Sequence, residues 1–258
     1  MNARPPDQDR GVREMKIAVL GGTGLIGSQV VKILQAEGHE AVPLSPSNGV
    51  DLLTGEGLDA GLKGADVVLN LTNSPTFDEA SADFFRSTME NLLAAAQRAG
   101  VGHAVILSIV GVDRVPDLAY YRAKVLQEEI LKAGPVPYSI VRATQFFEFA
   151  DAILSWTADG DTVRLPGTPV QPMASADVAK AVAEVAVGAP LRGIRNVAGP
   201  EVFMLDEWGR VALAAKGDKR IVVLDPAAGM FAAVPGDVLI APEGAVLATT
   251  TYRDWLTR

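Results

Sequence analysis

The chain has 258 residues, 48% of them hydrophobic, with no cysteine, two histidines and a formal net charge of -8. This composition indicates one sizeable core and excludes a disulfide framework, thiolate chemistry and a histidine-rich metal site, so we predict no bound metal. The negative charge disfavours nucleic acid and anionic membranes as partners, and no apolar run is long enough to span a bilayer. We therefore expect a cytoplasmic protein with a flexible tail over residues 1–14.

After the tail, short apolar runs alternate with longer amphipathic stretches. The predicted strands are residues 16–20, 40–44, 66–71, 103–110 and 137–143, and the predicted helices are residues 25–37, 58–63, 78–99 and 118–132. Such alternation is typical of a parallel sheet covered by helices on both faces. The predicted fold class is therefore α/β, a doubly wound parallel sheet of the Rossmann type.

Beyond residue 142 the alternation weakens. The pattern there predicts a short strand and turn over residues 160–167, a helix over 174–188, a strand over 220–224, and packing of Tyr252 on Trp255. We predict one NAD(P)-binding domain over residues 15–258. In it, the chain from about residue 143 onward contributes a small C-terminal region that covers the substrate.

The sequence GGTGLIG directly follows the first predicted strand and opens a predicted helix, a context that indicates a dinucleotide-binding turn. Gly21 or Gly22 permits the tight turn, Gly24 lets backbone N–H groups approach a diphosphate, and Gly27 lets helix and strand pack closely. The predicted cofactor contacts in this turn are Gly21, Gly22, Thr23, Gly24, Leu25, Ile26 and Gly27.

The end of the second predicted strand bears on the choice between NAD and NADP. It reads Leu44-Ser45-Pro46-Ser47 and lacks the carboxylate that usually binds the ribose hydroxyls of NAD, since Glu40 stands at the opposite end of the strand. The hydroxyls of Ser45 and Ser47 are available to a 2′-phosphate, although the arginine or lysine expected beside one is also missing. This pattern favours NADP(H) over NAD(H).

These segments resemble the short-chain dehydrogenase/reductase superfamily, specifically its atypical, NmrA-like branch of NAD(P)-binding proteins. The resemblance covers nearly the whole chain after the tail and rests on GGTGLIG, VDL, NLTNSP, ENLLAAAQRAGV, VILSIVGVD, YYRAK, SIVRATQFFE, ASADVAKAVAEV, NVAGPE and YRDWL. The resemblance implies further cofactor contacts. Asp51 and Leu52 would contact the adenine, and Leu71, Thr72 and Asn73 would lie along the cofactor. Lys124 would contact the nicotinamide ribose, and Ala143, Thr144 and Gln145 would lie beside the nicotinamide, where Thr144 or Gln145 can bond the carboxamide.

Tyr120 and Lys124 are four residues apart on a predicted helix, so their side chains share one face. A neighbouring ammonium lowers the pKa of a phenol, and the resemblance implies that Tyr120 is the general acid or base. Tyr121 stands three residues from Lys124 and does not match this spacing. Tyr120 and Lys124 are therefore the first two candidate catalytic residues.

Ser108 is the third candidate catalytic residue. In catalytically standard members of the family that the chain resembles, the serine hydroxyl that polarises the substrate carbonyl lies one or two positions later in the sequence. This chain has Ile109 and Val110 there. Ser108 therefore either serves the site or bonds to backbone at its strand end. This departure puts vigorous carbonyl reduction in doubt.

Several other side chains allow more than one interpretation. Arg142 is a partner for a buried carboxylate or an anchor for the substrate, and His103 is interpreted as a surface or edge residue. Asp177 is interpreted as a helix cap, and Phe146 and Phe147 fit the core or the nicotinamide loop.

The first predicted function is an NAD(P)H-dependent oxidoreductase that transfers a hydride to a small carbonyl, quinone or similar acceptor. The alternative is a non-enzymatic NmrA-like sensor of the NADP(H) redox state with a protein partner, and an epimerase or dehydratase of nucleotide sugars ranks last. The long predicted helices over 78–99 and 118–132 leave monomer and homodimer both open.

Overall fold

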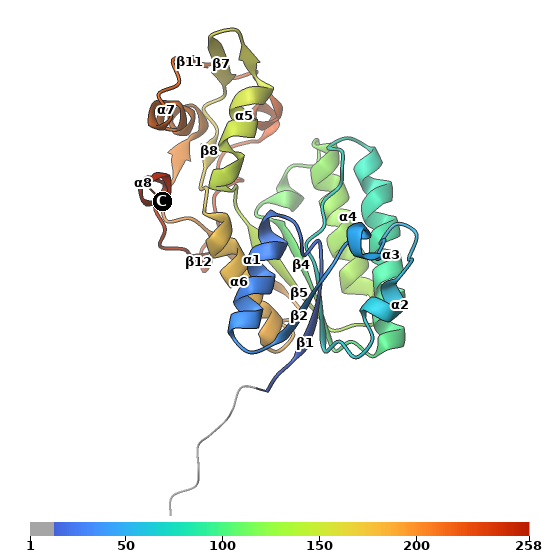
Figure 1. Ribbon diagram of the computed structural model, residues 1–258. Coiled ribbons are helices and arrows are strands. Elements are labelled where there is room, and N and C mark those ends of the chain that lie inside the picture. The colour runs from blue at the N-terminus through green and yellow to red at the C-terminus, as the bar shows by residue number, and fades with distance from the viewer. Residues whose placement is uncertain (1–12, 258) are drawn as a thin grey trace, which may run out of the picture.

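The computed structural model describes residues 13–257 and centres on one seven-stranded parallel sheet (Figure 1). Its strands are β1 (Lys16–Leu20), β2 (Glu40–Leu44), β3 (Val67–Asn70), β4 (His103–Ile109), β5 (Tyr138–Ala143), β9 (Ile194–Ala198) and β12 (Val246–Leu247). They lie in the order β12-β9-β5-β4-β3-β1-β2, and every neighbouring pair is parallel. The predicted α/β doubly wound sheet is confirmed. Of the predicted tail, residues 1–12 lie outside the described part of the chain.

Helices cover both faces of this sheet (Figure 1). On one face lie α1 (Leu25–Ala36) and α6 (Ser175–Val187), and on the other lie α2 (Leu58–Gly61), α3 (Ala80–Ala99) and α4 (Ala119–Ala133). In β1, Ile17 and Val19 join the first core while Ala18 and Leu20 join the second. Because successive side chains point to opposite faces, a strand covered on both sides is apolar throughout.

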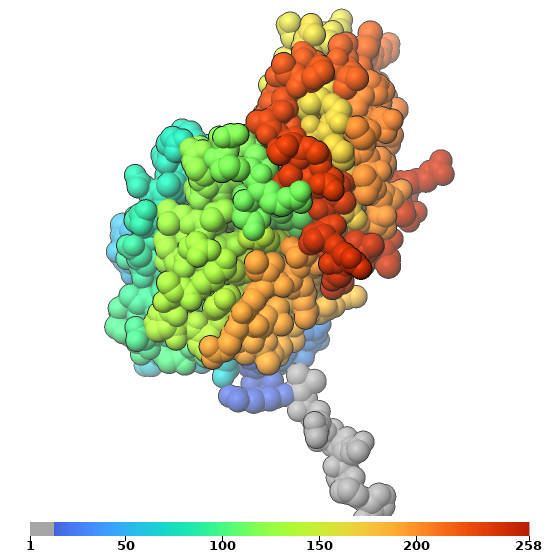
Figure 2. All heavy atoms as spheres, turned by 180° about the vertical axis from the view of Figure 1, so that it is seen from behind, coloured from blue at the N-terminus to red at the C-terminus, as the bar shows by residue number. Residues whose placement is uncertain are grey.

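A smaller part of the molecule lies beyond the carboxyl ends of the strands, where Figure 2 shows it standing above the body that holds the sheet. It contains α5 (Ala150–Trp156), α7 (Leu205–Ala215), a sheet of β6 (Ala158–Asp159), β7 (Thr162–Leu165) and β11 (Ile221–Leu224), and the antiparallel pair β8 (Pro169–Val170) and β10 (Phe203–Met204). The buried Trp208 lies in the hydrophobic cluster that joins these elements.

The C-terminal half also completes the main sheet, which the sequence did not predict. β9 pairs with β5, and β12 then pairs with β9. The β9 sequence IRNVA contains Arg195 and Asn196, and only Val197 and Ala198 are buried, so it lacks the apolar run of a central strand. β12 has two residues, both exposed. Neither segment carries the pattern by which a buried parallel strand is identified.

The last helix, α8 (Tyr252–Leu256), closes an aromatic cluster. Tyr252 is buried and stacks on Trp255 with ring centroids 5.8 Å apart, and it also contacts Phe147 and Trp208. The predicted packing of Tyr252 on Trp255 is confirmed. No helix within residues 13–257 combines the length and apolar character needed to cross a bilayer.

His103 is not a surface or edge residue, and that interpretation was wrong. It opens β4, an interior strand between β3 and β5, and is 3% exposed. Its Nε2 shares a 2.8 Å hydrogen bond with the Ser139 hydroxyl, and burial lowers its pKa. Both features indicate a neutral structural histidine.

Arg142 has a structural partner, and the interpretation of Asp177 as a helix cap was wrong. Arg142 donates to both carboxylate oxygens of the buried Glu128, at 2.8 and 2.6 Å, so it is the partner of a buried carboxylate. Asp177 lies in the first turn of α6, but Glu148 performs the capping. The Glu148 carboxylate accepts from the backbone N–H of Ser175 at 3.1 Å and from its hydroxyl at 2.6 Å.

Candidate functional site

The turn between β1 and α1 has the backbone geometry that its glycines allow. Gly21 has a φ of +74°, in the left-handed region that favours glycine, and its N–H donates to the Leu44 carbonyl at 3.1 Å. A Cβ atom on Gly27 would lie 2.1 Å from the Gly21 carbonyl oxygen. Gly21 therefore makes the turn, and Gly27 lets α1 approach it closely.

The first turn of α1 presents unpaired backbone donors. The N–H groups of Leu25, Ile26 and Gly27 have no acceptor among the described residues, because Gly24 at the N-cap has no side chain to cap them. The first turn also contains no acidic residue. Unpaired N–H groups at a helix N-terminus, together with the helix dipole, form a site for an anion. This cradle fits a diphosphate.

A cavity of about 910 Å³ begins at this cradle and runs along the carboxyl ends of the strands to α4 and α5. The predicted site residues all line it except Gly22 and Ser47. A Cβ on Gly22 would lie 2.7 Å from Pro43, so Gly22 packs against β2, and the Ser47 hydroxyl bonds that of Ser45 at 2.8 Å. The structure thus gathers residues from widely separated parts of the chain around one space.

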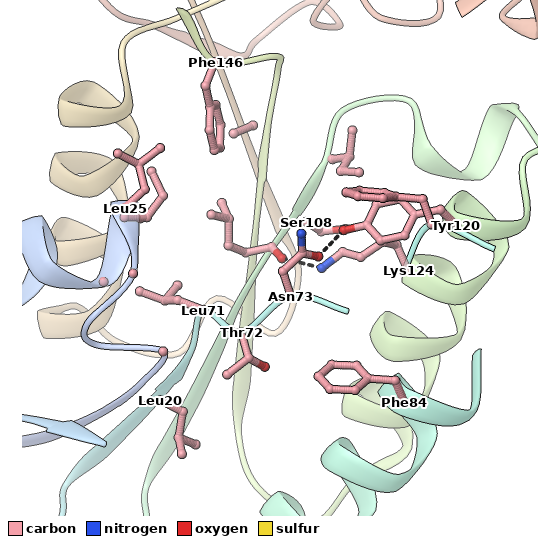
Figure 3. Close-up of a pocket in the computed structure, with 18 of the residues that line it drawn as sticks. Leu20, Leu25, Leu71, Thr72, Asn73, Phe84, Ser108, Tyr120, Lys124 and Phe146 are labelled. Atoms are coloured by element: carbon pink, nitrogen blue, oxygen red, sulfur yellow. Dashed lines mark hydrogen bonds between the residues drawn. The ribbon is translucent and has the colours of Figure 1, made fainter. Parts of the chain in front are cut away.

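Tyr120 and Lys124 lie one turn apart on α4 and face this cavity (Figure 3). The Tyr120 hydroxyl donates to Oδ1 of Asn73, and burial raises the pKa of Tyr120 to about 12. The Lys124 ammonium donates to the Leu107 carbonyl at 2.8 Å and to the Gln127 side chain at 2.5 Å. Burial lowers the pKa of Lys124 to about 8. Tyr120 is therefore a neutral phenol at neutral pH, and the expectation that the neighbouring ammonium lowers its pKa was wrong.

Ser108 lies at the end of β4, but its hydroxyl is bound to another side chain. It donates to Oε1 of Glu128 at 2.6 Å, and Glu128 is fully buried between Ser108 and Arg142. Since a hydroxyl has one proton, Ser108 has none to offer to a ligand in this arrangement.

The two candidates for the nicotinamide carboxamide differ in their hydrogen bonds. The Thr144 hydroxyl donates to the Gln171 carbonyl at 2.6 Å. The side-chain amide of Gln145 is buried, and neither its nitrogen nor its oxygen has a partner among the described residues. Buried polar groups normally have a hydrogen-bond partner. Of Thr144 and Gln145, Gln145 is therefore the one whose side chain is free to bond the carboxamide.

Much of the remaining cavity lining is aromatic and apolar, and of these residues the sequence singled out only Phe146. They are Phe77, Phe84, Phe146, Phe149, Ala152, Ile153, Trp156, Met230 and Phe231. Phe77 contacts both Tyr120 and Trp156, with ring centroids 4.9 and 6.4 Å away. These side chains come from four segments that share no motif, so no spacing in the sequence could have linked them.

Comparison with known proteins gives several matches. The NAD(P)H-binding family matches residues 21–187. Photosystem II assembly factor Ycf39 of Synechocystis sp. is 27% identical over 190 residues, which is 64% of this chain and 56% of that protein. The matched region thus spans little more than half of that relative.

Two solved structures share the fold along nearly the whole chain. A dTDP-4-dehydrorhamnose reductase from Bacillus anthracis in complex with NADP is 17% identical, with a TM-score of 0.74 over 95% of this chain and 98% of that one. An NADPH-dependent quinone oxidoreductase from Escherichia coli is 17% identical, with a TM-score of 0.62 over 93% and 98%. Because the family match covers well over half of the sequence, the chain belongs to the NAD(P)H-binding family.

Proposed function

We propose that this protein is an NADPH-dependent oxidoreductase that reduces a small aromatic carbonyl compound, such as a quinone, with Tyr120 as the proton donor. The observation that carries the proposal is the continuity of one cavity. It joins the unpaired N–H groups of α1 to Tyr120 and then to a set of aromatic side chains. The same cavity therefore contains a binding site for a diphosphate, a proton donor and an apolar surface.

The cofactor half would be held by groups already described. The N–H groups of Leu25, Ile26 and Gly27 suit the diphosphate, and the unpartnered Gln145 amide suits the carboxamide. The nicotinamide, when bound, supplies the hydride. Lys124 would hold the ribose beside Tyr120, with its ammonium over the Phe85 ring at 4.9 Å from the ring centroid.

The acceptor half favours a flat, apolar molecule. Phe77, Phe149 and Trp156 are each about half exposed, as expected of apolar side chains that a bound ligand would cover. Aromatic faces stack on planar rings, whereas the cavity offers few polar groups for a sugar. α5 and the chain around Phe231, both beyond residue 143, would cover this substrate. The Escherichia coli protein of similar fold is named for quinone reduction.

The proton step follows from the state of Tyr120. Because burial raises its pKa to about 12, the phenol is protonated at neutral pH. Its hydroxyl is bonded to a neutral amide oxygen, that of Asn73, and would turn from it to give its proton to an acceptor oxygen. Replacing Tyr120 by phenylalanine is expected to lower kcat by about 100-fold and leave the Kd of NADPH unchanged. NADPH oxidation with 9,10-phenanthrenequinone measures kcat, and quenching of protein fluorescence measures the Kd.

The matched control is Tyr138→Phe, which removes a hydroxyl that donates to the Arg192 carbonyl outside the cavity. It should keep the wild-type kcat. If Tyr120→Phe also kept it, Tyr120 would not be the proton donor.

The preference for NADP(H) is tested at the end of β2. Ser45 lines the cavity and no carboxylate stands beside it on that strand end. Replacing Ser45 by aspartate should raise the Kd of NADPH by about 10-fold or more, because the carboxylate repels the 2′-phosphate, and should leave NADH binding nearly unchanged. Calorimetry with both nucleotides measures this, and an equal effect on both would contradict the preference.

The second candidate function is a redox sensor that binds NADP(H) and reports to a protein partner without turnover. The Ser108 hydroxyl favours it, because the bond to Glu128 leaves no serine to polarise a carbonyl. Tight NADPH binding without oxidation by any aldehyde, quinone or nitro compound would establish the sensor.

A further inference from the structure

We infer that Asn73 is a catalytic residue whose side-chain amide donates a hydrogen bond to the carbonyl oxygen of the acceptor, in place of the missing serine. The inference rests on the proposed oxidoreductase function. Asn73 follows β3 and lines the cavity, and Figure 3 shows its side chain directed toward Tyr120.

Hydrogen bonds fix which way the Asn73 amide faces. The backbone N–H of Ser74 donates to Oδ1 of Asn73 at 3.0 Å, and the Tyr120 hydroxyl is bonded to the same atom. A backbone N–H can only donate, so the atom it contacts must be the oxygen. The orientation of the amide is thus set by chemistry.

The other end of the amide is unused. Within residues 13–257, Nδ2 of Asn73 has no hydrogen-bond partner, and the side chain is exposed toward the cavity. The two bonds to Oδ1 hold the amide in place, so its NH₂ group needs little reorganisation to meet a ligand. Fixed donors aimed at developing negative charge stabilise a transition state strongly.

The neighbouring donors are already engaged. The Ser108 hydroxyl donates to Glu128, and the Thr72 hydroxyl donates to Asn70 at 2.6 Å. Lys124 directs its ammonium to the Leu107 carbonyl and the Gln127 side chain. Of the side chains Thr72, Asn73, Ser108 and Lys124, Asn73 is thus the one with a neutral donor that has no partner within residues 13–257.

The step balances in atoms and electrons. A hydride from the reduced nicotinamide adds to the acceptor, and the carbonyl π pair moves onto oxygen. The Asn73 NH₂ group stabilises the charge on that oxygen. The O–H bond of Tyr120 then breaks as its proton forms the O–H bond of the product, and Tyr120 recovers a proton from solvent. The acceptor is reduced by two electrons and the nicotinamide is oxidised by two.

The decisive variant is Asn73→Asp. A carboxylate of the same shape keeps an oxygen to accept from Ser74 and Tyr120, so the structural hydrogen bonds persist, but it removes the donor. With saturating NADPH and 9,10-phenanthrenequinone, Asn73→Asp and Asn73→Ala should both lower kcat by about 100-fold. Gln97→Glu makes the same amide-to-acid change on the exposed face of α3 and should keep the wild-type kcat.

The pH profile separates a donor from a structural acceptor. When the new carboxyl of Asn73→Asp is protonated at low pH, it regains an O–H donor, so its kcat should rise relative to that of Asn73→Ala as pH falls. If Asn73→Asp keeps wild-type kcat at neutral pH, the inference is overturned while the proposed function stands. If the wild type turns over no acceptor, the proposed function fails first.

Discussion

Replacing Gly27 by alanine is expected to abolish NADPH binding, with Kd raised by about 1000-fold. The added Cβ would lie 2.1 Å from the Gly21 carbonyl oxygen, a separation that no packing tolerates. α1 must then move away from the turn, and the N–H groups of Leu25, Ile26 and Gly27 no longer point together toward the diphosphate. Three hydrogen bonds to a charged group, at about 1.5 kcal/mol each, give an effect of this size. Calorimetry with NADPH measures it.

The control for this variant is Gly102→Ala, because a Cβ there would meet only the Asp66 carbonyl oxygen at 3.6 Å, an ordinary contact. It should bind NADPH as the wild type does. Circular dichroism on Gly27→Ala shows whether the sheet and helices persist. Wild-type affinity in a folded Gly27→Ala variant would refute the diphosphate cradle.

Replacing Glu128 by alanine is expected to lower the free energy of unfolding by about 3–5 kcal/mol, because it leaves the Arg142 guanidinium buried with only a half-exposed partner. Glu128 is 1% exposed and its carboxylate bonds Arg142 and Ser108. The remaining partner of Arg142 is Asp113, at 3.0 Å and 53% exposed. Urea unfolding followed by circular dichroism measures the loss.

A surface pair provides the comparison. Arg98 and Asp59 form an ion pair at 2.7 Å in which both side chains are more than half exposed. Arg98→Ala should therefore cost less than about 1 kcal/mol. Equal losses in Glu128→Ala and Arg98→Ala would show that burial of the Glu128 carboxylate adds nothing to its stabilising effect.

The core of the sheet and its helices could be predicted from the sequence because each of these elements is marked by a pattern within its own residues. β1, β3 and β4 are apolar runs, each followed by a helix with its own periodicity, and both faces of each strand must be apolar when helices cover them. β9 and β12 were missed because their place is set by neighbours distant in the chain. Asn196 in β9 breaks the apolar pattern.

The same distinction applies to the site. The glycine turn is a contiguous motif, and its context identified it. The commitment of Ser108 to Glu128 could not be predicted, since it depends on the rotation of α4 against β4. Trp156 and Phe77 meet across the cavity although nearly eighty positions separate them, and aromatic residues that belong to no motif look like core residues in a sequence.

The placement of β9 against β5 limits how this chain can be trimmed. Residues 140–143 of β5 pair with residues 194–197 of β9, beyond the point where the family match ends at residue 187. A fragment cut there would leave β5 with a bare row of main-chain donors and acceptors along an apolar strand, a template for association with other chains. A fragment meant for expression should therefore include β9.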